Sequence, residues 1–173
     1  MQTARGSMPV VPNAWISNLL TPALVVPALA ATTKADVLET LATLIGRARP
    51  DIDLRLLASL LHDRERQSTT ALEHGVAVPH ARLPELGAPV AALGRSSAGV
   101  AYGASDGRPT QLFLLIVVAA EQPGSHLKML ANAARLLGDP GCRSRLLEAR
   151  SADAMLATLR EQEVRALSRL RAA

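Results

Sequence analysis

Leu112-Phe113-Leu114-Leu115-Ile116-Val117-Val118-Ala119 is a continuous apolar run that begins shortly after Pro109. It has the length of a strand and no polar face, so we expect a central strand that is buried on both sides. Shorter runs predict further strands at Leu24–Val26, at Gly75–Val78, at Val90–Leu93 and at Val100–Tyr102. A turn of Ser and Gly residues is expected to separate the last two.

Helices are predicted around these strands from capping residues and from the spacing of apolar residues. Five are expected, beginning at Thr32 or Thr33, near Asp53, at Ser125, at Asp139 and at Ser151. A turn or short helix is expected at Thr69–His74. Strands and helices in this order predict an α/β sandwich, in which a mostly buried sheet lies between helical layers.

The composition limits the functions that the chain can have. Its 173 residues suit one domain with a real core. Hydrophobic residues make up 49% of the chain, yet Phe, Trp and Tyr occur once each, so stacking of bases on aromatic rings is nearly excluded. The net charge of +4 comes from arginines spread along the chain rather than gathered in one basic run. Nucleic acid is therefore not an expected partner.

The single cysteine and the N-terminal apolar stretch indicate the cellular compartment in which the protein is expected. Cys142 has no possible intrachain disulfide partner and no neighbouring ligand pair, so we expect a reducing compartment and no metal site. The stretch Leu19–Ala31 is interrupted by Pro22 and Pro27 and is too short to cross a membrane. We expect a cytoplasmic protein that does not insert into membranes.

Gly75-Val76-Ala77-Val78-Pro79-His80-Ala81-Arg82 contains the first candidate functional residue. Pro79 has no N–H to donate to a sheet, so the strand is expected to end there and His80 to follow in a loop. A histidine in such a place can be a nucleophile, a ligand or a proton carrier. The alternative is an ordinary polar residue at a strand end. His62 and His74 are expected on the surface.

His126 is the second candidate, in the first turn of the helix expected after Ser125. A helix N-terminus favours an anion, because it offers free N–H groups and the positive end of the dipole. If the strands before them are neighbours, His80 and His126 converge and can hold a phosphoryl group, with Arg64 and Arg82 as donors to its oxygens. The alternative is that His126 faces water.

Ala77-Val78-Pro79-His80-Ala81-Arg82 resembles the phosphorylation motif of enzyme IIA of the bacterial phosphotransferase system. The class is the fructose/mannitol one (type 2), and the likeness is greatest to its nitrogen-regulatory form. The resemblance extends over about Ile16 to Glu163. Further matches follow in the family's order: Leu19-Leu20-Thr21-Pro22, Arg64-Glu65 and Ser125-His126-Leu127.

The resemblance implies a three-layer sandwich with a mixed sheet of about five strands. It implies that His80 is the nucleophile, taking a phosphoryl group from an HPr-type carrier protein. His126 would stabilise that group and Arg64 would neutralise developing charge. The resemblance implies no cofactor: neither ATP, nicotinamide nor a metal. The enzyme IIA domain is expected at residues 16–163, after a disordered or appended segment at 1–15.

Residues 164–173 are expected as an Arg-rich helix end or tail, and the arginines of this region are Arg160, Arg165, Arg169 and Arg171. This segment either touches an acidic partner or is a solvated helix end.

Two positions depart from the family pattern. Ahead of the motif the family usually has Ser-Thr-Gly-hydrophobic-Gly, where this chain has Thr69-Thr70-Ala71-Leu72-Glu73. Glycine permits backbone geometries that Ala71 and Glu73 resist, and Glu73 adds negative charge. Both changes bear on docking of the carrier and on the transfer rate.

Three functions remain open. The first is a nitrogen-regulatory phosphohistidine relay, whose phosphorylation state decides which proteins it binds. The second is a sugar-specific enzyme IIA that passes the phosphoryl group to a IIB component for fructose or mannitol import. The third is a binding module that no longer transfers phosphate. We expect the first, because no IIB-like or membrane IIC-like segment is attached.

Overall fold

The computed structural model describes residues 15–172, and their centre is a five-stranded sheet. Its strands are β1 (Val25–Val26), β2 (Val76–Ala77), β3 (His80–Leu83), β4 (Val90–Val100) and β5 (Thr110–Ala119). The order is β1-β4-β5-β2, and β3 also pairs with β5. The pair β4–β5 is antiparallel, whereas β1 is parallel to β4 and both β2 and β3 are parallel to β5. The sheet is therefore mixed.

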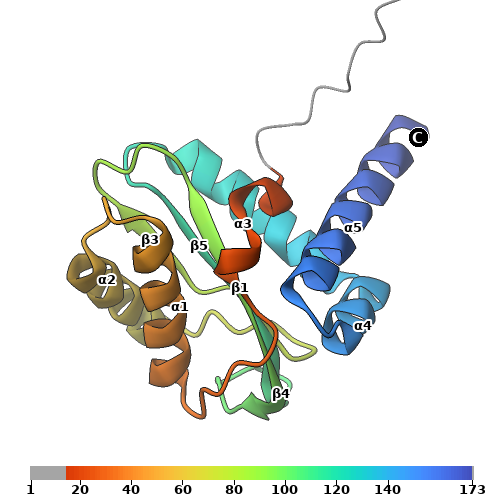
Figure 1. The fold of residues 1–173 in the computed structure, drawn as a ribbon, viewed down its shortest axis with the longest axis horizontal. Helices are drawn as coiled ribbons and strands as arrows, with labels where there is room; N and C mark the ends of the chain where they lie inside the picture. The colour runs from red at the N-terminus through yellow and green to blue at the C-terminus, as the bar shows by residue number, and fades with distance from the viewer. Residues whose placement is uncertain (1–14, 173) are drawn as a thin grey trace, which may run out of the picture.

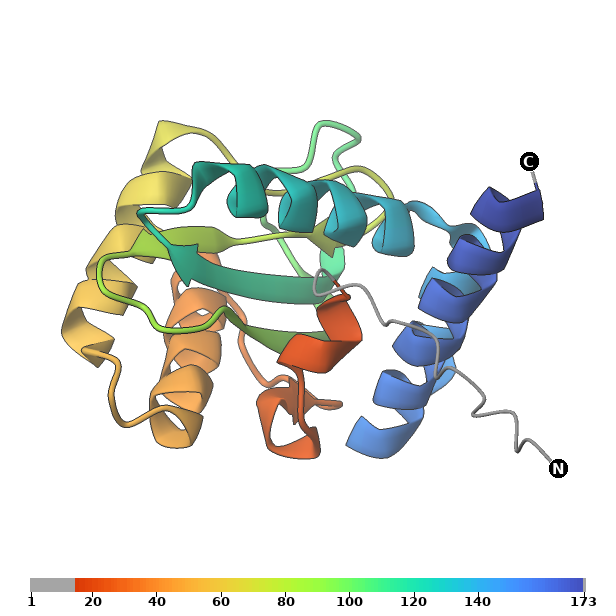
Figure 2. The same ribbon diagram turned by 90° about the horizontal axis from the view of Figure 1, so that it is seen from above.

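Helices cover both sides of this sheet (Figures 1 and 2). Helices α1 (Lys34–Ala48) and α2 (Leu54–Gln67) lie on one side. On the other side are α3 (Pro123–Gly138), α4 (Pro140–Glu148) and α5 (Ala152–Ala172), which also pack against one another. The short 3₁₀ turns η1 (Ile16–Leu19) and η2 (Pro22–Leu24) precede β1. The expected α/β sandwich is confirmed.

Strand β5 is the central strand that its apolar sequence predicts. Every residue from Leu112 to Ala119 is buried. The ring of Phe113 lies 5.4 Å from that of Tyr102, which places two of the few aromatic side chains together in the core. The C-terminal end of this strand leads directly to α3, so β5 positions the start of that helix.

Strand β4 differs from the prediction. Two strands, Val90–Leu93 and Val100–Tyr102, were expected around a turn, but a single strand covers most of this stretch and Tyr102 lies outside it. A bulge carries the Ser/Gly residues, since the register against β5 shifts after Arg95. Gly99 has a φ of 75°, and a Cβ there would lie 2.8 Å from Cβ of Pro109. Glycine therefore bends this strand where a turn was expected.

Most of the expected helix starts are confirmed. Side-chain oxygens accept from backbone N–H groups of the first helical turn at four of these starts: Thr33, Asp53, Asp139 and Ser151. The prediction for Ser125 is wrong: α3 begins at Pro123, with Gln122 as its N-cap residue. Proline is favoured at the first helical position because its fixed φ suits the helix, so the helix starts before the serine.

The ends of the chain bear on two further expectations. The predicted N-terminal segment 1–15 lies outside the described residues apart from Trp15. Helix α5 continues past Glu163 to Ala172, so residues 164–172 are a helix end rather than a separate tail. The side chain of Arg171 lies outside the description. None of the helices in residues 15–172 combines the length and the apolar character that crossing a membrane requires.

Candidate active site

His80 is the first residue of β3, not a loop residue beyond the sheet as expected. Strands β2 and β3 pair with β5 in one continuous register, Val76 opposite Leu112 and His80 opposite Ile116. Pro79 interrupts them because it lacks an N–H, but its carbonyl still accepts a hydrogen bond from Ile116 N, at 3.0 Å. The sheet thus resumes after the proline and holds the histidine backbone firmly.

The two ring nitrogens of His80 have different partners. Nδ1 lies 2.9 Å from the carbonyl oxygen of Val78, and Nε2 lies 3.0 Å from Nε of Arg64. A guanidinium can only donate, so Nε2 must accept, and the ring proton is on Nδ1 and is donated to Val78. The imidazole is thereby fixed in one tautomer, with its basic lone pair at Nε2.

Arg64 lies in the last turn of α2 and bridges two parts of the site. Besides its bond to His80, its Nη1 donates to the carbonyl oxygen of Ser68 at 3.0 Å and to the Ser68 hydroxyl at 3.3 Å. The guanidinium is therefore held at both ends, by the histidine and by the loop that follows its own helix.

His126 faces His80 across the site. Their ring centroids are 5.2 Å apart, with an angle of 54° between the ring planes. The alternative that His126 faces water is wrong, because the residue is only 9% exposed. Nδ1 of His126 is buried, and no described group hydrogen bonds to it. The structure therefore brings together the two histidines that the sequence analysis singled out.

These side chains open into a cleft of about 400 Å³. Its lining joins α2, β3 and the start of α3, and comprises Leu60, Asp63, Arg64, Gln67, His80, Ala81, Arg82 and His126. A second hollow of about 220 Å³ shares Arg64 and His80 and is otherwise mostly apolar. The exposed Arg82 adds a second positive charge to the cleft. His62 lies outside it and pairs with Glu39, at 2.8 Å.

Both histidines are held uncharged by their surroundings. Burial lowers the pKa of His80 below its ordinary 6.5, and the charges of Arg64 and Arg82 act in the same direction, against the hydrogen bond to Val78. Burial also lowers the pKa of His126, with further contributions from His80 and the two arginines. Nε2 of His80 therefore carries no proton at neutral pH, and its lone pair accepts from Arg64.

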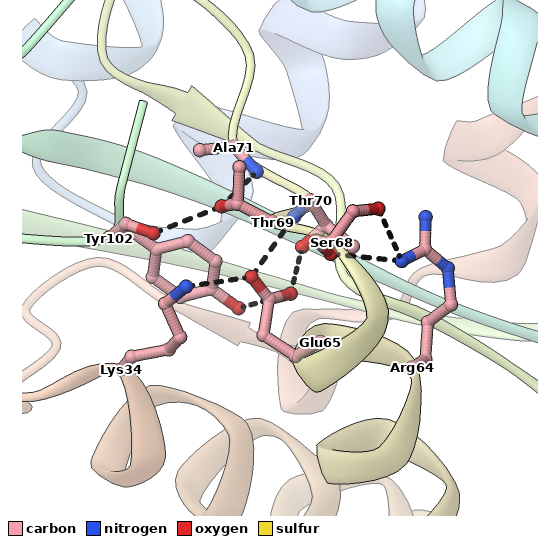
Figure 3. A network of polar contacts seen from close by, with 8 residues as sticks. All are labelled: Lys34, Arg64, Glu65, Ser68, Thr69, Thr70, Ala71 and Tyr102. Carbon is pink, nitrogen blue, oxygen red and sulfur yellow. Dashed lines mark hydrogen bonds and ion pairs between the residues drawn. The ribbon is translucent and has the colours of Figure 1, made fainter. Parts of the chain in front are cut away.

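Sequence reasoning missed the buried carboxylate of Glu65, next to Arg64. Its side chain is 4% exposed, and its oxygens accept from Lys34 Nζ at 2.9 Å, Thr70 N at 3.0 Å, Thr70 Oγ1 at 2.5 Å and Tyr102 O–H at 3.5 Å (Figure 3). Burial, together with the charge of Glu65, raises the pKa of Tyr102. No local pattern reveals the whole cluster, because Lys34 and Tyr102 lie 31 and 37 residues from Glu65 in the sequence.

The two departures from the family pattern stand at positions whose backbone does not require glycine. The expected turn or short helix at Thr69–His74 is instead an irregular segment in which Ala71 pairs with Ala77 in an isolated bridge, and neither Ala71 nor Glu73 has a positive φ. Positive φ values occur instead at His74 (65°) and Gly75 (75°). The exposed side chain of Glu73 does not line the cleft. The expected strain and charge at these positions are thus absent from the surroundings of His80.

The chain matches the family "Phosphoenolpyruvate-dependent sugar phosphotransferase system, EIIA 2" over residues 18–162. A nitrogen regulatory protein of Bradyrhizobium diazoefficiens is 32% identical over 144 residues, which cover 83% of this chain and 94% of that protein. The fructose-specific EIIABC component of Bacillus subtilis is 30% identical over 148 residues, or 86% of this chain. The match spans only 23% of that longer protein.

Solved structures of this family have the same fold as this chain. Nitrogen regulatory protein IIA-Ntr from Neisseria meningitidis superposes with a TM-score of 0.78 at 26% identity, covering 83% of this chain and 98% of that one. IIA mannitol from Escherichia coli superposes with a TM-score of 0.69 at 19% identity, covering 81% of this chain and 98% of that one, and this likeness supports the fold alone. These likenesses confirm the mixed five-stranded sheet with flanking helices. This chain therefore belongs to the type 2 enzyme IIA family, the phosphoryl-relaying components of the phosphotransferase system.

Proposed function

We propose that this protein relays its phosphoryl group through Nε2 of His80 and acts mainly in nitrogen-regulatory signalling. One observation carries the choice of atom: Nδ1 donates its proton to Val78, so the lone pair of the neutral ring is at Nε2, inside a cleft with two arginines. A positioned, uncharged nitrogen beside cationic groups is what attack on a phosphoryl group requires.

The proposed step is an exchange of one P–N bond for another. The lone pair at Nε2 of His80 attacks the phosphorus of a phosphohistidine on an HPr-type carrier, while the P–N bond on the carrier breaks and its electron pair returns to the carrier's imidazole. The His80 ring becomes an imidazolium as the new bond forms. Val78 then stabilises it, because its carbonyl already accepts from Nδ1–H.

Arg64 and His126 would act on the phosphoryl group itself. Arg64 Nε now donates to the lone pair that the phosphorus must take, so this bond breaks and the guanidinium turns to the phosphoryl oxygens. His126 has a buried, unpartnered Nδ1 and lies beside the ring that receives the group. It can hydrogen bond to the bound group, and Arg82 adds positive charge at the mouth of the cleft.

The regulatory role is supported by the relatives. Nitrogen regulatory proteins from Bradyrhizobium diazoefficiens and Pseudomonas aeruginosa match over 94% and 91% of their lengths. A phosphoryl group on His80 would add negative charge to a cleft that now carries two arginines. Such a change makes or breaks interfaces, so the two states would bind different target proteins.

The sugar-transport alternative also has support. Fructose-specific components from Bacillus subtilis and Haloferax volcanii are 30% and 33% identical to this chain. A solved complex of enzyme IIA mannitol with phosphorylated enzyme IIB from Escherichia coli shares the fold, with a TM-score of 0.66. In this alternative a IIB component is the acceptor. The binding-module alternative rested on Ala71 and Glu73, and two observations speak against it: neither residue has a positive φ, and neither lines the cleft that contains both histidines.

The test is phosphoryl transfer from a phosphorylated HPr-type carrier to the intact chain. We expect an acid-labile, alkali-stable label, and we expect the His80→Gln variant to take none. His126→Gln should still be labelled, but about 10- to 100-fold more slowly, the effect of one hydrogen bond to a charged group. His62→Gln is the matched control, since His62 lies outside the cleft, and it should keep the wild-type rate. A label that persists in His80→Gln would exclude His80 as the nucleophile.

The role is tested with the labelled protein. Rapid loss of the label to a IIB component with a reactive cysteine would favour sugar transport. Retention of the label, together with target proteins that bind only one of the two states, would favour regulation. A genomic neighbourhood with nitrogen sigma-factor genes, rather than IIB and IIC genes, would point the same way.

A further inference from the structure

We infer that Glu65 is a positioning residue that holds both the Arg64 guanidinium and the His80 imidazole in place, acting through Thr70. This inference rests on the proposed function for its effect on phosphoryl transfer. Its structural content is separate: one buried carboxylate at the end of α2 fixes a loop that binds Arg64 directly (Figure 3) and reaches the His80 ring through Val78.

The first step is the anchoring of Thr70. Glu65 accepts from both the backbone N–H and the hydroxyl of Thr70, at 3.0 and 2.5 Å. Lys34 from α1 and Tyr102 from beyond β4 donate to the same carboxylate, at 2.9 and 3.5 Å. A buried carboxylate with this many donors is held tightly, because each broken bond would leave a buried polar group unsatisfied. Through Glu65, Thr70 is thereby linked to α2, to Lys34 of α1 and to Tyr102.

The second step leads to Arg64. Ser68 lies two residues before Thr70, and its carbonyl and hydroxyl both accept from Nη1 of Arg64. Thr69, between them, donates its hydroxyl to the Tyr102 carbonyl at 3.0 Å. Because the loop is tied down at Thr69 and Thr70, the Ser68 carbonyl has a fixed position. The side chains of Arg64 and Glu65 therefore leave α2 in different directions and hydrogen bond to the same short loop, Arg64 to Ser68 and Glu65 to Thr70 (Figure 3).

The third step leads to His80. The carbonyl oxygen of Thr70 accepts from the backbone N–H of Val78, at 3.0 Å. The carbonyl oxygen of that same Val78 accepts from Nδ1 of His80, at 2.9 Å. This bond favours the tautomer with the proton on Nδ1, the same one that the Arg64 donation to Nε2 requires, so the position of the Val78 carbonyl helps to decide which nitrogen is the base. Glu65, through Thr70, thus supports the tautomer of the nucleophile as well as its arginine.

The test compares variants that keep size or charge but lose the contact. Thr70→Val removes the hydroxyl at nearly constant shape, and Thr70→Ser restores it. Glu65→Asp keeps the charge but is too short to reach Thr70, and Glu39→Asp makes the same change at an exposed carboxylate of α1 as a control. Two quantities are measured on the intact chain: the rate of phosphoryl transfer from the carrier, and the fraction of His80 with its proton on Nδ1, from ¹⁵N–¹H spectra of the imidazole.

We expect Thr70→Val and Glu65→Asp to slow transfer by roughly 10- to 100-fold, the usual effect of a small misplacement of reacting groups. Both should lower the fraction of the Nδ1–H tautomer, while Thr70→Ser and Glu39→Asp stay close to wild type. Folded Thr70→Val or Glu65→Asp protein with the wild-type rate and tautomer would overturn the inference. If the wild-type chain takes no label, the proposed function fails, and the tautomer comparison still decides this inference.

Discussion

His80 is expected to stay uncharged at pH values where a free imidazole takes up a proton. Burial and the two arginines lower its pKa below 6.5, and His126 shifts in the same direction. NMR titration of the ring protons should give midpoints below 6.5 for both. Arg64→Gln should raise the His80 midpoint, because it removes a nearby positive charge. Arg66→Gln, whose side chain pairs with Asp63 instead, should leave that midpoint unchanged.

The same shifts affect stability in a definite direction. Below pH 6.5 the unfolded chain takes up protons at these two histidines that the folded protein does not, so the free energy of unfolding falls as the pH drops from 6.5 towards the folded-state pKa values. Above 6.5 both states are neutral at these residues, and the contribution is constant. A His80 midpoint at or above 6.5 would contradict the proposed reason for its nucleophilicity.

At this scale the sequence identifies residue types but not their contacts. His80, His126 and Arg64 were recognised from a strand end, a helix start and a motif, all of which are local. The tautomer of His80 and the cluster around Glu65 were not, since each also needs a partner far along the chain: Arg64 for His80, and Lys34 and Tyr102 for Glu65. Side chains that meet only after folding leave no short-range pattern.

Among the elements, β4 has a position at which only glycine fits without strain. Gly99 is at a φ of 75°, and a Cβ there would meet Pro109 at 2.8 Å. Gly99→Ala should therefore lower the free energy of unfolding by about 1–3 kcal/mol, measured by urea denaturation. Gly87→Ala is the control, because a Cβ at Gly87 has open space and should change stability by less than about 0.5 kcal/mol. Equal losses in the two variants would mean that the bulge tolerates a side chain.

The element predictions failed where a local signal had two structural meanings. The Ser/Gly residues before Val100 are typical of turns, yet here they form a bulge within one strand, because pairing with β5 resumes in a shifted register at Val100, opposite Thr110. Ser125 is a good capping residue, yet Pro123 starts α3 earlier. By contrast β5 and α1 were predicted well, since the strand-like length of the apolar run after Pro109 and the amphipathic spacing after Thr33 each favour one structure.

For the whole molecule, periodicity predicted an α/β sandwich but could not order its strands. The parallel pairing of β2 and β3 with β5, and of β1 with β4, joins segments far apart in the chain. The mixed five-stranded sheet was implied only by the resemblance to enzyme IIA. That sheet is what places the end of β5, and so the start of α3, beside His80, which no single element specifies.

Glu163 of α5 links the C-terminal helix to η1, the first described element of the chain. Its buried carboxylate accepts from Ile16 N at 2.6 Å, and from Ser17 N and the Ser17 hydroxyl at 3.3 and 2.5 Å. In Glu163→Gln an amide NH₂ replaces one of the two carboxylate oxygens. This donor then faces the backbone N–H of Ile16 or of Ser17, which is also a donor. The free energy of unfolding should therefore fall by about 1–3 kcal/mol. Glu161→Gln, on the exposed side of the same helix, should cost less than about 0.5 kcal/mol, because its pair with Arg165 is a solvated one. If urea denaturation gives the same stability for both variants, the carboxylate does not hold η1 against α5, and packing alone closes the domain.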